Sequence, residues 1–258
     1  MKKGLLILAT LLILLAFFAG GCTTSAGIRE TQQYAETGFT KVQVDSAFEV
    51  EINSSDSYSI SVTAPKKLFK YITVEKQGDT LEAGMHWGWA FWNSWGFKKA
   101  KIVITLPELE ELNLSGACKG TVRGFNSTRD FKLGLSGASS LNLEMAADDM
   151  TVVVSGASYA DGQINGDDIR LVVSGASTVE FDGEINTIDM QISGASHAKL
   201  DGLAVVDADI DVSGASSATT AATGTINVVL SGASTLEYTD SPVLGNLDIT
   251  GASSIKKR

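Results

Sequence analysis

The tripeptide Ser-Gly-Ala recurs through the second half of this chain at nearly constant spacing. Its first residue falls at positions 115, 136, 155, 174, 193, 213 and 231, and a Thr-Gly-Ala variant begins at Thr250. Successive copies are 21, 19, 19, 19, 20, 18 and 19 residues apart. Such a regular period predicts a solenoid, in which each repeat is one structural unit that buries its apolar face only against its neighbours.

The residues around each serine alternate between apolar and mixed positions. Those one, three and five residues before it are almost all apolar, as at Leu135, Leu133 and Phe131. Apolar residues return five and seven positions after the serine, as at Leu141 and Leu143. This period of two predicts strands with one buried face, because successive side chains of a strand point to opposite sides of the sheet.

Strands and glycine corners repeated in this way predict an all-β fold, a single-stranded right-handed parallel β-helix with coils of about 19 residues. Each coil would pair with the next at about 4.8 Å, and parallel crossovers are normally right-handed. Glycine would supply a corner with positive φ, alanine would fit a tight interior, and serines would stack as hydroxyl ladders. A β-sandwich of repeated hairpins is the alternative, but hairpins would not place one tripeptide at the same location eight times.

The first 22 residues have the features of an export signal. Lys2 and Lys3 precede an apolar run over residues 5–18, which is shorter than the ~20 residues of a membrane span, and small residues lead to Cys22. This pattern predicts a lipoprotein-type signal peptide over residues 1–21 and lipidation of Cys22, so that the membrane is a partner through the lipid anchor. An ordinary signal peptide and an uncleaved anchor are the alternatives. All three place the folded part outside the cytoplasm.

The remaining sequence divides into three regions. Residues 22–38 are polar without periodicity and are predicted to form a tether. Residues 39–107 alternate like strands but lack the tripeptide, which predicts an irregular N-terminal β region or cap. Residues 108–258 are predicted to form the repeat solenoid, whose final basic cluster, 256–258, would discourage end-on pairing of strands.

Charge and cysteine content narrow the possible partners. Without residues 1–21 the chain carries 18 basic and 30 acidic residues, a net charge of −12, which argues against nucleic acid as a partner. With Cys22 lipidated, Cys118 has no partner for a disulfide. It occupies a position where other copies have serine, so we expect a buried substitute for serine rather than a reactive thiol.

All four tryptophans of the chain lie within nine residues, just before the first repeat. The candidate binding residues are Trp87, Trp89, Phe91, Trp92 and Trp95. They predict an aromatic surface that stacks on a surface glycan or docks a protein, because tryptophan is enriched at interfaces. A segment folded over the solenoid to cover apolar surface is the structural alternative, and insertion into the membrane beside the anchor is a third.

The sequence predicts no catalytic residues, no cofactor and no metal site. His86 and His197 lie in different regions, and no serine has a histidine and an acid at a recognisable spacing. The acid pairs at 148–149 and 167–168 would stack in successive coils, where a Ca²⁺ site is less expected than solvated turn acids. Polysaccharide-cleaving β-helices carry acids clustered with basic residues, whereas Arg123, Arg129 and Arg170 are scattered here.

Repeated Ser-Gly-Ala-Ser units behind a lipoprotein-type signal resemble the putative auto-transporter adhesin, head GIN domain family, over residues 39–253. The resemblance implies a single-stranded right-handed β-helix on the cell exterior and a role in adhesion, and it carries no catalytic or ligand residues. The predicted function is a lipid-anchored adhesion or binding module at the cell surface, not an enzyme. A structural envelope protein and a carbohydrate-active β-helix enzyme are the alternatives.

Overall fold

A computed structural model describes residues 28–86 and 100–258. The N-terminal elements are β1 (Arg29–Tyr34), β2 (Lys41–Val44), β3 (Phe48–Ser54), β4 (Ser59–Pro65), the 3-10 helix η1 (Lys66–Tyr71), β5 (Ile72–Gln77), β6 (Thr80–Met85) and β7 (Ala100–Leu106).

The repeat region is built entirely from short connections and strands. These strands are β8 (Glu111–Leu114), β9 (Lys119–Asn126), β10 (Phe131–Leu135), β11 (Ser140–Ala146), β12 (Met150–Val154), β13 (Tyr159–Val173), β14 (Thr178–Ile192), β15 (His197–Val212), β16 (Ser217–Ala222), β17 (Thr225–Leu230), β18 (Thr235–Thr239), β19 (Val243–Ile249) and β20 (Ser254–Lys257).

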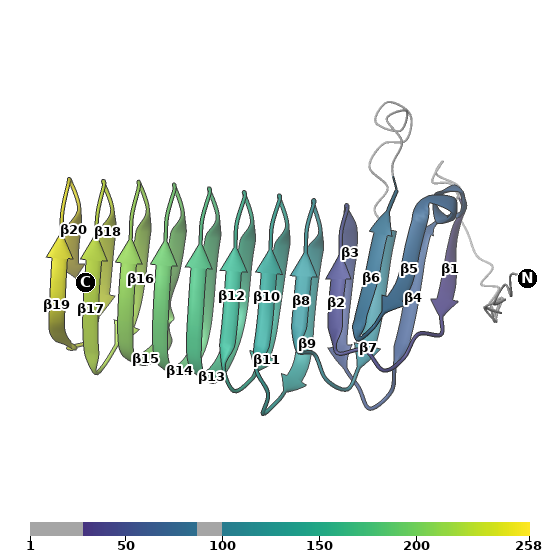
Figure 1. Cartoon of the computed structure of the whole chain (residues 1–258), viewed down its shortest axis with the longest axis horizontal. Helices are drawn as coiled ribbons and strands as arrows, with labels where there is room; N and C mark the ends of the chain where they lie inside the picture. Colours follow the sequence, from purple (N-terminus) through teal and green to yellow (C-terminus); the bar gives the residue numbers. More distant parts are fainter. Residues whose placement is uncertain (1–27, 87–99) are drawn as a thin grey trace, which may run out of the picture.

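The strands stack into a right-handed β-solenoid, which confirms the predicted fold class (Figure 1). A first sheet leads into the Ser-Gly-Ala corner and contains β8, β10, β12, β17 and β19, together with the second halves of β13, β14 and β15. A second sheet leaves the corner and contains β9, β11, β16, β18 and β20, with the first halves of the same three strands. Pairing between successive coils is parallel throughout this region.

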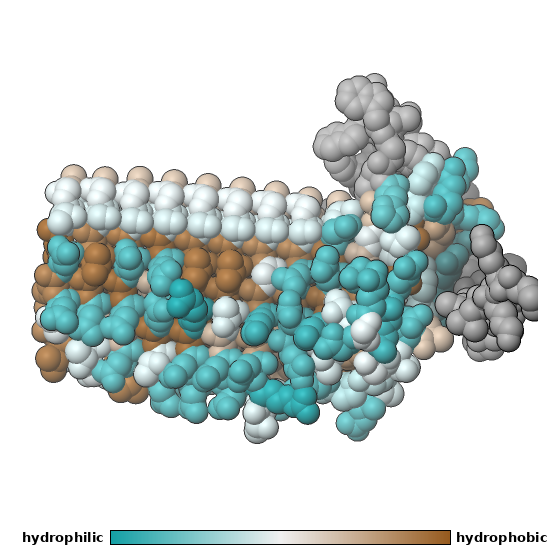
Figure 2. All heavy atoms as spheres, in the orientation of Figure 1, coloured by the Kyte–Doolittle hydropathy of each residue, from teal (hydrophilic) through white to brown (hydrophobic). Residues whose placement is uncertain are grey.

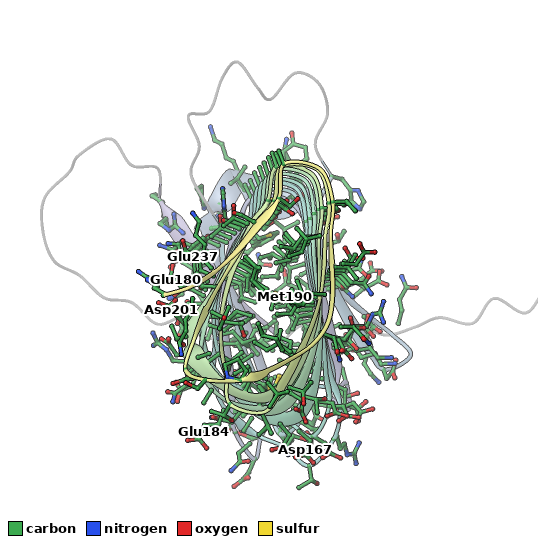
Figure 3. The ribbon with its side chains drawn as sticks, turned by 90° about the vertical axis from the view of Figure 1, so that its left-hand side faces the viewer. Asp167, Glu180, Glu184, Met190, Asp201 and Glu237 are labelled. Atoms are coloured by element: carbon green, nitrogen blue, oxygen red, sulfur yellow. The ribbon has the colours of Figure 1, made fainter. Side chains whose placement is uncertain are left out.

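The apolar residues predicted to face inward form a continuous core between the two sheets. Leu133, Leu135, Leu141 and Leu143 are at most 2% exposed, and the same positions are buried through most of the following coils. Viewed end-on, the section is an elongated oval with Met190 inside it (Figure 3). One coil cannot enclose these side chains, so the core exists only because the coils stack.

Glycine is required at each corner by both conformation and spacing. The φ angles of Gly156 and Gly175 are +80° and +81°, in the left-handed region. A Cβ added to Gly175 would lie 2.4 Å from the carbonyl oxygen of Gly156. Successive corners are therefore in backbone-to-backbone contact, which any side chain would prevent.

The alanine of the tripeptide lies outside the solenoid, so the predicted interior position for it is wrong. Ala157 and Ala176 are exposed, whereas the serines that follow, Ser158 and Ser177, are 2% and 0% exposed. The left-handed glycine reverses the chain so that the residue after alanine, rather than alanine itself, points inward. The alanine contributes its backbone instead, because the N–H of Ala176 donates to the carbonyl of Gly156 at 2.8 Å.

The buried serines accept hydrogen bonds from backbone amides of the preceding coil. The N–H of Ser158 donates to Oγ of Ser177 at 3.3 Å, and the N–H of Ser177 donates to Oγ of Ser196 at 3.4 Å. A hydroxyl-to-hydroxyl contact, as predicted for the ladder, joins Ser234 to Ser253 at 3.1 Å. Because a buried amide without a partner costs about 1–3 kcal/mol, serine at these corners satisfies a donor that turns into the core. Oγ of Ser158 is an exception, since it has no hydrogen-bond partner among the described residues.

The first coil of the chain lies between two later ones. β2 pairs in parallel with both β6 and β8, and β3 pairs in parallel with both β7 and β9. After β3 the chain turns outward through β4, η1 and β5, returns as the coil β6–β7, and then crosses the first coil to begin β8. Antiparallel strands β4 and β5 continue the sheets beyond β7 and β6 and cover this end (Figure 1).

Part of the predicted tether is ordered as a strand. Residues Arg29–Tyr34 form β1, which pairs antiparallel with β4. Its side chains alternate between exposed and half-buried, because β1 lies at the edge of the sheet and faces no closed core. Because its residues are polar, this strand shows no alternation of apolar residues, and the sequence did not predict it.

Residues 107–110 carry the chain across the first coil, and Glu110 fixes this crossing. Its N–H donates to the Thr40 carbonyl at 2.8 Å, and its own carbonyl accepts from the N–H of Lys132 at 2.9 Å. Its carboxylate accepts from the Arg129 guanidinium and, at 3.0 Å, from Oγ1 of Thr40. The hydrogen bond from Arg129, followed by that from Thr40, holds the pKa of Glu110 below its ordinary value.

A comparison of Gly175→Ala with Gly78→Ala separates the two requirements for glycine, which are the left-handed backbone conformation and the close contact with the preceding coil. Gly78 has φ +63° in the β5–β6 turn, and an added Cβ there meets nothing within 4 Å. Each substitution should lower the free energy of unfolding by about 1–2 kcal/mol, because alanine disfavours the left-handed conformation. Only Gly175→Ala also places a Cβ against the backbone of the preceding coil. We expect a clearly larger fall in thermal midpoint for Gly175→Ala, measured by circular dichroism. Equal falls would show that corner contact adds nothing.

Glu110→Gln should destabilise the protein in a pH-dependent way. Because the folded-state pKa of Glu110 is lowered, its contribution is present above the unfolded glutamate pKa of about 4.3 and is lost as pH falls through the lowered value. We expect the variant to have a lower thermal midpoint than the parent at pH 7 and the gap to close near pH 3. Glu144→Gln, at an exposed position of β11, is the control. A gap independent of pH would contradict the ionic role.

Candidate functional site

The residues predicted to carry lipid or ligand lie outside the described part of the chain. Cys22 precedes residue 28, and the aromatic residues Trp87, Trp89, Phe91, Trp92 and Trp95 fall between His86 and Ala100. Within residues 28–86 and 100–258 there is no helix long and apolar enough to cross a membrane.

The two strands that flank the aromatic segment, β6 and β7, border the row of stacked corners in which the Ser-Gly-Ala tripeptides lie. Val44 pairs with Ala83 in β6 and with Leu114 in β8, directly before the corner that begins at Ser115. On the far side of the corner, Ala100 is fully buried and pairs with Phe48. β6 therefore ends, and β7 begins, at the positions that flank a four-residue corner in the repeat coils.

The outer surface of the first sheet between β14 and β19 carries carboxylates and amides in register. We call it the acid–amide face; it consists of Asp189, Gln191, Asp207, Asp209, Asp211, Asn227, Asn246 and Asp248. Figure 2 views the first sheet, where hydrophilic side chains form rows over the hydrophobic layer. The rows follow from the parallel register, which places equivalent outward residues above one another.

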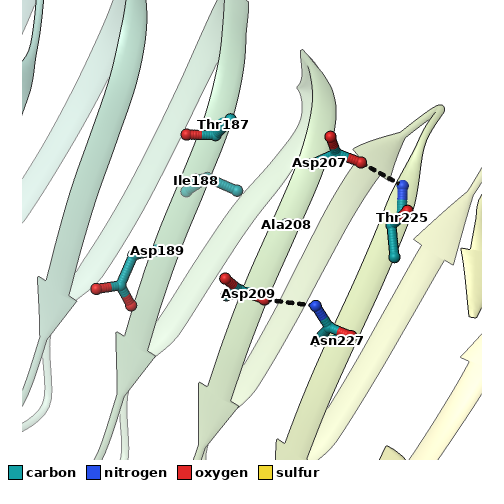
Figure 4. A pocket seen from close by; sticks show the side chains of 8 residues that line it. All are labelled: Thr187, Ile188, Asp189, Asp207, Ala208, Asp209, Thr225 and Asn227. Atoms are coloured by element: carbon teal, nitrogen blue, oxygen red, sulfur yellow. Dashed lines mark hydrogen bonds between the residues drawn. The ribbon is translucent and has the colours of Figure 1, made fainter. Parts of the chain in front are cut away.

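Hydrogen bonds between coils hold the acid–amide face in place. The amide of Asn227 donates to Oδ1 of Asp209 at 2.7 Å, and the N–H of Thr225 donates to Oδ1 of Asp207 at 2.6 Å (Figure 4). Asn227 in turn accepts from the N–H of Asn246 at 2.9 Å. At the border of the acid–amide face next to β13, Arg170 forms an ion pair with Asp189 at 2.9 Å. This ion pair partly balances the negative charge of the aspartates there.

An open groove of about 340 Å³ runs across this face and is lined by Thr187, Asp189, Asp207, Asp209, Thr225 and Asn227 among others. Its lining offers many hydrogen-bond acceptors and few apolar surfaces. Ligand sites that bury a small molecule are usually concave and mostly apolar. The groove therefore suits a contact surface for hydroxyl-rich or cationic groups better than an enclosed reaction site.

The period-two alternation in the sequence places Asp189, Asp209 and Asp211 at outward positions of their strands but does not group them. The available signal was the register itself. Asp189, Asp209 and Asn227 occupy the same position relative to the tripeptide in three successive coils, so the parallel pairing stacks them. A comparison of outward columns, and not only inward ones, would have found the face.

The two histidines are separated along the solenoid. His86 follows β6, and His197 begins β15, six coil steps away through β2, β8, β10, β12, β13 and β14. At about 4.8 Å per coil this is roughly 29 Å. His197 lies on the exposed outer surface of the second sheet, with Nδ1 2.8 Å from Oγ of Ser217. The two rings cannot serve one reaction.

The acid pairs at 148–149 and 167–168 stack in successive coils, as expected. The N–H of Asp167 donates to the carbonyl of Asp148 at 2.9 Å. Carboxylates of the second pair accept hydrogen bonds from the next coil, Asp167 from Asn186 at 2.7 Å and Asp168 from Thr187 at 2.5 Å. In the described part of the chain, no group of three or more His, Cys, Asp or Glu side chains is arranged to hold a metal ion.

Cys118 is a buried thiol at the inner position of the first tripeptide corner. It is 1% exposed, and its Sγ lies 2.7 Å from the Ser46 carbonyl oxygen, to which it donates. Its own N–H donates to Oγ of Ser139 at 3.3 Å, which is the hydrogen bond the buried serines make in later coils. Cys118 is therefore a substitute for serine in this column, as the sequence indicated.

Solved structures share this fold at low sequence identity. A putative lipid binding protein from Parabacteroides distasonis ATCC 8503 has a TM-score of 0.80 at 20% identity, covering 90% of this chain and 97% of its own. A putative adhesin from the same organism gives 0.82 at 17%, covering 90% and 98%. One from Parabacteroides merdae ATCC 43184 gives 0.81 at 17%, covering 90% and 97%. A comparison with curated proteins found none that matches the sequence.

The family described as "Putative auto-transporter adhesin, head GIN domain" matches residues 38–242, which include the N-terminal coils and all but the last coil of the repeat. The stacked Ser-Gly-Ala corners and the interleaved first coil lie within this match. The family and the similar structures are described as adhesins or binding proteins and not as enzymes. On these grounds the chain belongs to the putative auto-transporter adhesin, head GIN domain family.

Proposed function

We propose that this protein is a lipid-anchored adhesin of the cell exterior, which binds a surface glycan or protein and performs no catalysis. The observation that carries the proposal is the position of the β6–β7 connection. β6 ends and β7 begins on the corner side of the coil nearest the covered end, and the residues between these strands include all four tryptophans of the chain. Tryptophan side chains supply large, rigid contact surfaces for sugar rings and protein partners.

The anchor and the aromatic segment belong to the same end of the molecule. Residue 28 leads into β1, which pairs with β4 at the covered N-terminal end (Figure 1). A lipid on Cys22 would hold this end close to the membrane, with the stacked coils extending away from it. Ten coil levels from β6 to β19 rise roughly 43 Å at about 4.8 Å per step. The rod would thus display its sheets and its far end at a distance from the lipid surface.

Adhesion fits the described surfaces better than binding of a lipid, which the name of one similar structure suggests. A lipid tail needs an apolar cavity of its own. The interior of this solenoid is filled by its own side chains, with Phe131, Met190 and Phe181 at most 1% exposed. The groove around Asp207 and Asp209 on the acid–amide face is lined mainly by carboxylate, amide and hydroxyl side chains.

Alanine replacement of Trp89 and Trp92 together tests the binding role. A glycan array and a surface extract would be probed with the chain from residue 23, which keeps every described residue. We expect binding by the parent, loss of binding in the double variant, and binding by Tyr159→Ala, the control at a 39% exposed aromatic on the second sheet. Absence of binding by the parent would favour a structural envelope protein. Turnover of a polysaccharide would favour a carbohydrate-active enzyme.

The anchor is tested separately by metabolic labelling with a fatty acid. Cys22→Ser should abolish labelling, because the thiol is the predicted attachment point. Cys118→Ser is the matched control and should keep full labelling, since Cys118 is 1% exposed inside the solenoid. Labelling that survives Cys22→Ser would contradict the lipoprotein assignment without affecting the binding role.

A further inference from the structure

The C-terminal end of the solenoid leaves the apolar core uncovered. Every residue of β19 is exposed, and its inward-facing Leu244, Leu247 and Ile249 are 40%, 45% and 40% exposed. Their partners in β17 are at most 2% exposed, although they occupy the same columns. The left-hand end of Figure 2 is correspondingly hydrophobic. The difference arises because β17 is covered by β19, whereas no described coil covers β19.

The backbone at this end is also unpaired on one side. Among the described strands, β19 pairs only with β17, and β20 pairs only with β18. Each therefore presents an edge of amide and carbonyl groups beside the exposed leucines. An apolar core flanked by two free strand edges is a template for another chain of the same kind.

The opposite end does not offer such a surface. There Leu68 of η1 and Ile72 and Val74 of β5 are 5%, 8% and 8% exposed, because the antiparallel strands and η1 cover the core. One copy cannot stack its open end on the covered end of the next, so a filament is not available. A two-fold, end-to-end pair of open ends is the closed arrangement that remains.

We propose that the open C-terminal end binds the same end of a second copy of this chain. The two-fold axis runs along the oval section, from the Ser-Gly-Ala corner to the opposite turn, and keeps narrow corner against narrow corner (Figure 3). β19 runs toward the corner and β20 away from it. This rotation therefore lays β19 of one copy beside β20 of the other in antiparallel orientation, and does so twice.

Side chains at the two edges are complementary in this arrangement. Opposite residues of an antiparallel pair share a face, so inward Ile249 meets inward Ile255 of the second copy. The next outward pair is then Asp248 with Lys256 of the second copy. The acidic residue belongs to the acid–amide face, and the lysine faces outward from the second sheet beside Glu237. Each interface therefore contains this opposite-charge pair twice.

The basic cluster at 256–258 does not oppose this pairing, in contrast to the prediction from its sequence. Nζ of Lys257 donates to Oγ of Ser241 at 3.1 Å, and the Arg258 guanidinium pairs with Asp201 at 3.2 Å. Both charges are turned back toward residues of their own chain, Arg258 reaching an earlier coil. Lys256 is left to face the acidic strand of the second copy.

The inference deepens the proposed function and rests on it for its biological setting. With the lipid at the covered end, the open ends point away from the membrane. Pairing of open ends then joins copies held on two facing surfaces, which is homophilic adhesion through the solenoid tip. The pairing itself depends only on β19 and β20 and not on the anchor or the aromatic segment.

Sedimentation over a range of concentrations tests the pairing with the chain from residue 23. We expect a monomer–dimer equilibrium in the parent and monomers at every concentration for Leu247→Lys. Val206→Lys is the matched control, because Val206 is 46% exposed on the side of the solenoid while Leu247 is 45% exposed at its end. A parent that stays monomeric, or one that grows beyond a dimer, overturns the proposal. So does a control that loses the dimer as Leu247→Lys does.

A charge exchange identifies which strands meet. Asp248→Lys and Lys256→Asp should each weaken the dimer by roughly tenfold, because each places like charges opposite one another. The double variant should recover the parent affinity. All positions are exposed in the monomer, so circular dichroism should be unchanged. Single variants that dimerise like the parent, or a double variant that does not recover, would contradict the β19–β20 pairing.

Vesicle aggregation separates this inference from the proposed function. The chain from residue 23, held by an N-terminal histidine tag on nickel-chelating lipid vesicles, should aggregate them, and Leu247→Lys should abolish the light-scattering increase. The result is independent of fatty acylation and of Trp89. Aggregation together with failed lipid labelling would retain the tip pairing and reject the native anchor. Dispersed vesicles from the parent would overturn adhesion between copies.

Discussion

The hydrogen bond between an alanine N–H and the glycine carbonyl of the preceding coil is the constraint on which the solenoid depends. Ala195, for example, donates to Gly175 at 2.8 Å, and the same bond recurs at every tripeptide corner after the first. It brings backbone against backbone, so neither glycine tolerates a Cβ. The sharp turn then points the following residue into the core, where serine satisfies the amide that the corner leaves behind. One contact thus accounts for the glycine of the corner and for the buried serine that follows it.

That requirement leaves the tripeptides little freedom for function. Their glycines are fixed by spacing and their inner serines by a buried amide, while their outer alanines are small. Chemistry can vary only on the outward columns of the sheets, in the corner connections and at the two ends. The acid–amide face, the β6–β7 connection and the open end at β19 occupy these three places. The repeat therefore restricts the search for function to sites that stacking does not determine.

Local periodicity was sufficient to predict the strands of the repeat, the inward columns and the corner glycines, because each depends on neighbours in sequence. The exposed position of Ala176 was missed, since it depends on the three-dimensional path of a left-handed turn. The place of β2 between β6 and β8 was also missed, because pairing between distant segments leaves no periodic trace. Ile249 and Leu230 both directly precede their tripeptides, and Ile249 is the exposed one because no described coil covers it.

The strand edge at β1 differs from the strand edge at β19 in its side chains, and the difference favours contact at β19. β1 presents charged and polar side chains such as Arg29 and Glu30, which discourage pairing with another chain. β19 has the sequence Val-Leu-Gly-Asn-Leu-Asp-Ile, with one charge and four apolar residues, all exposed. A terminal coil gains nothing in its own stability from exposed leucines, since apolar surface in water contributes no burial energy. An unprotected edge is instead what pairing between copies requires.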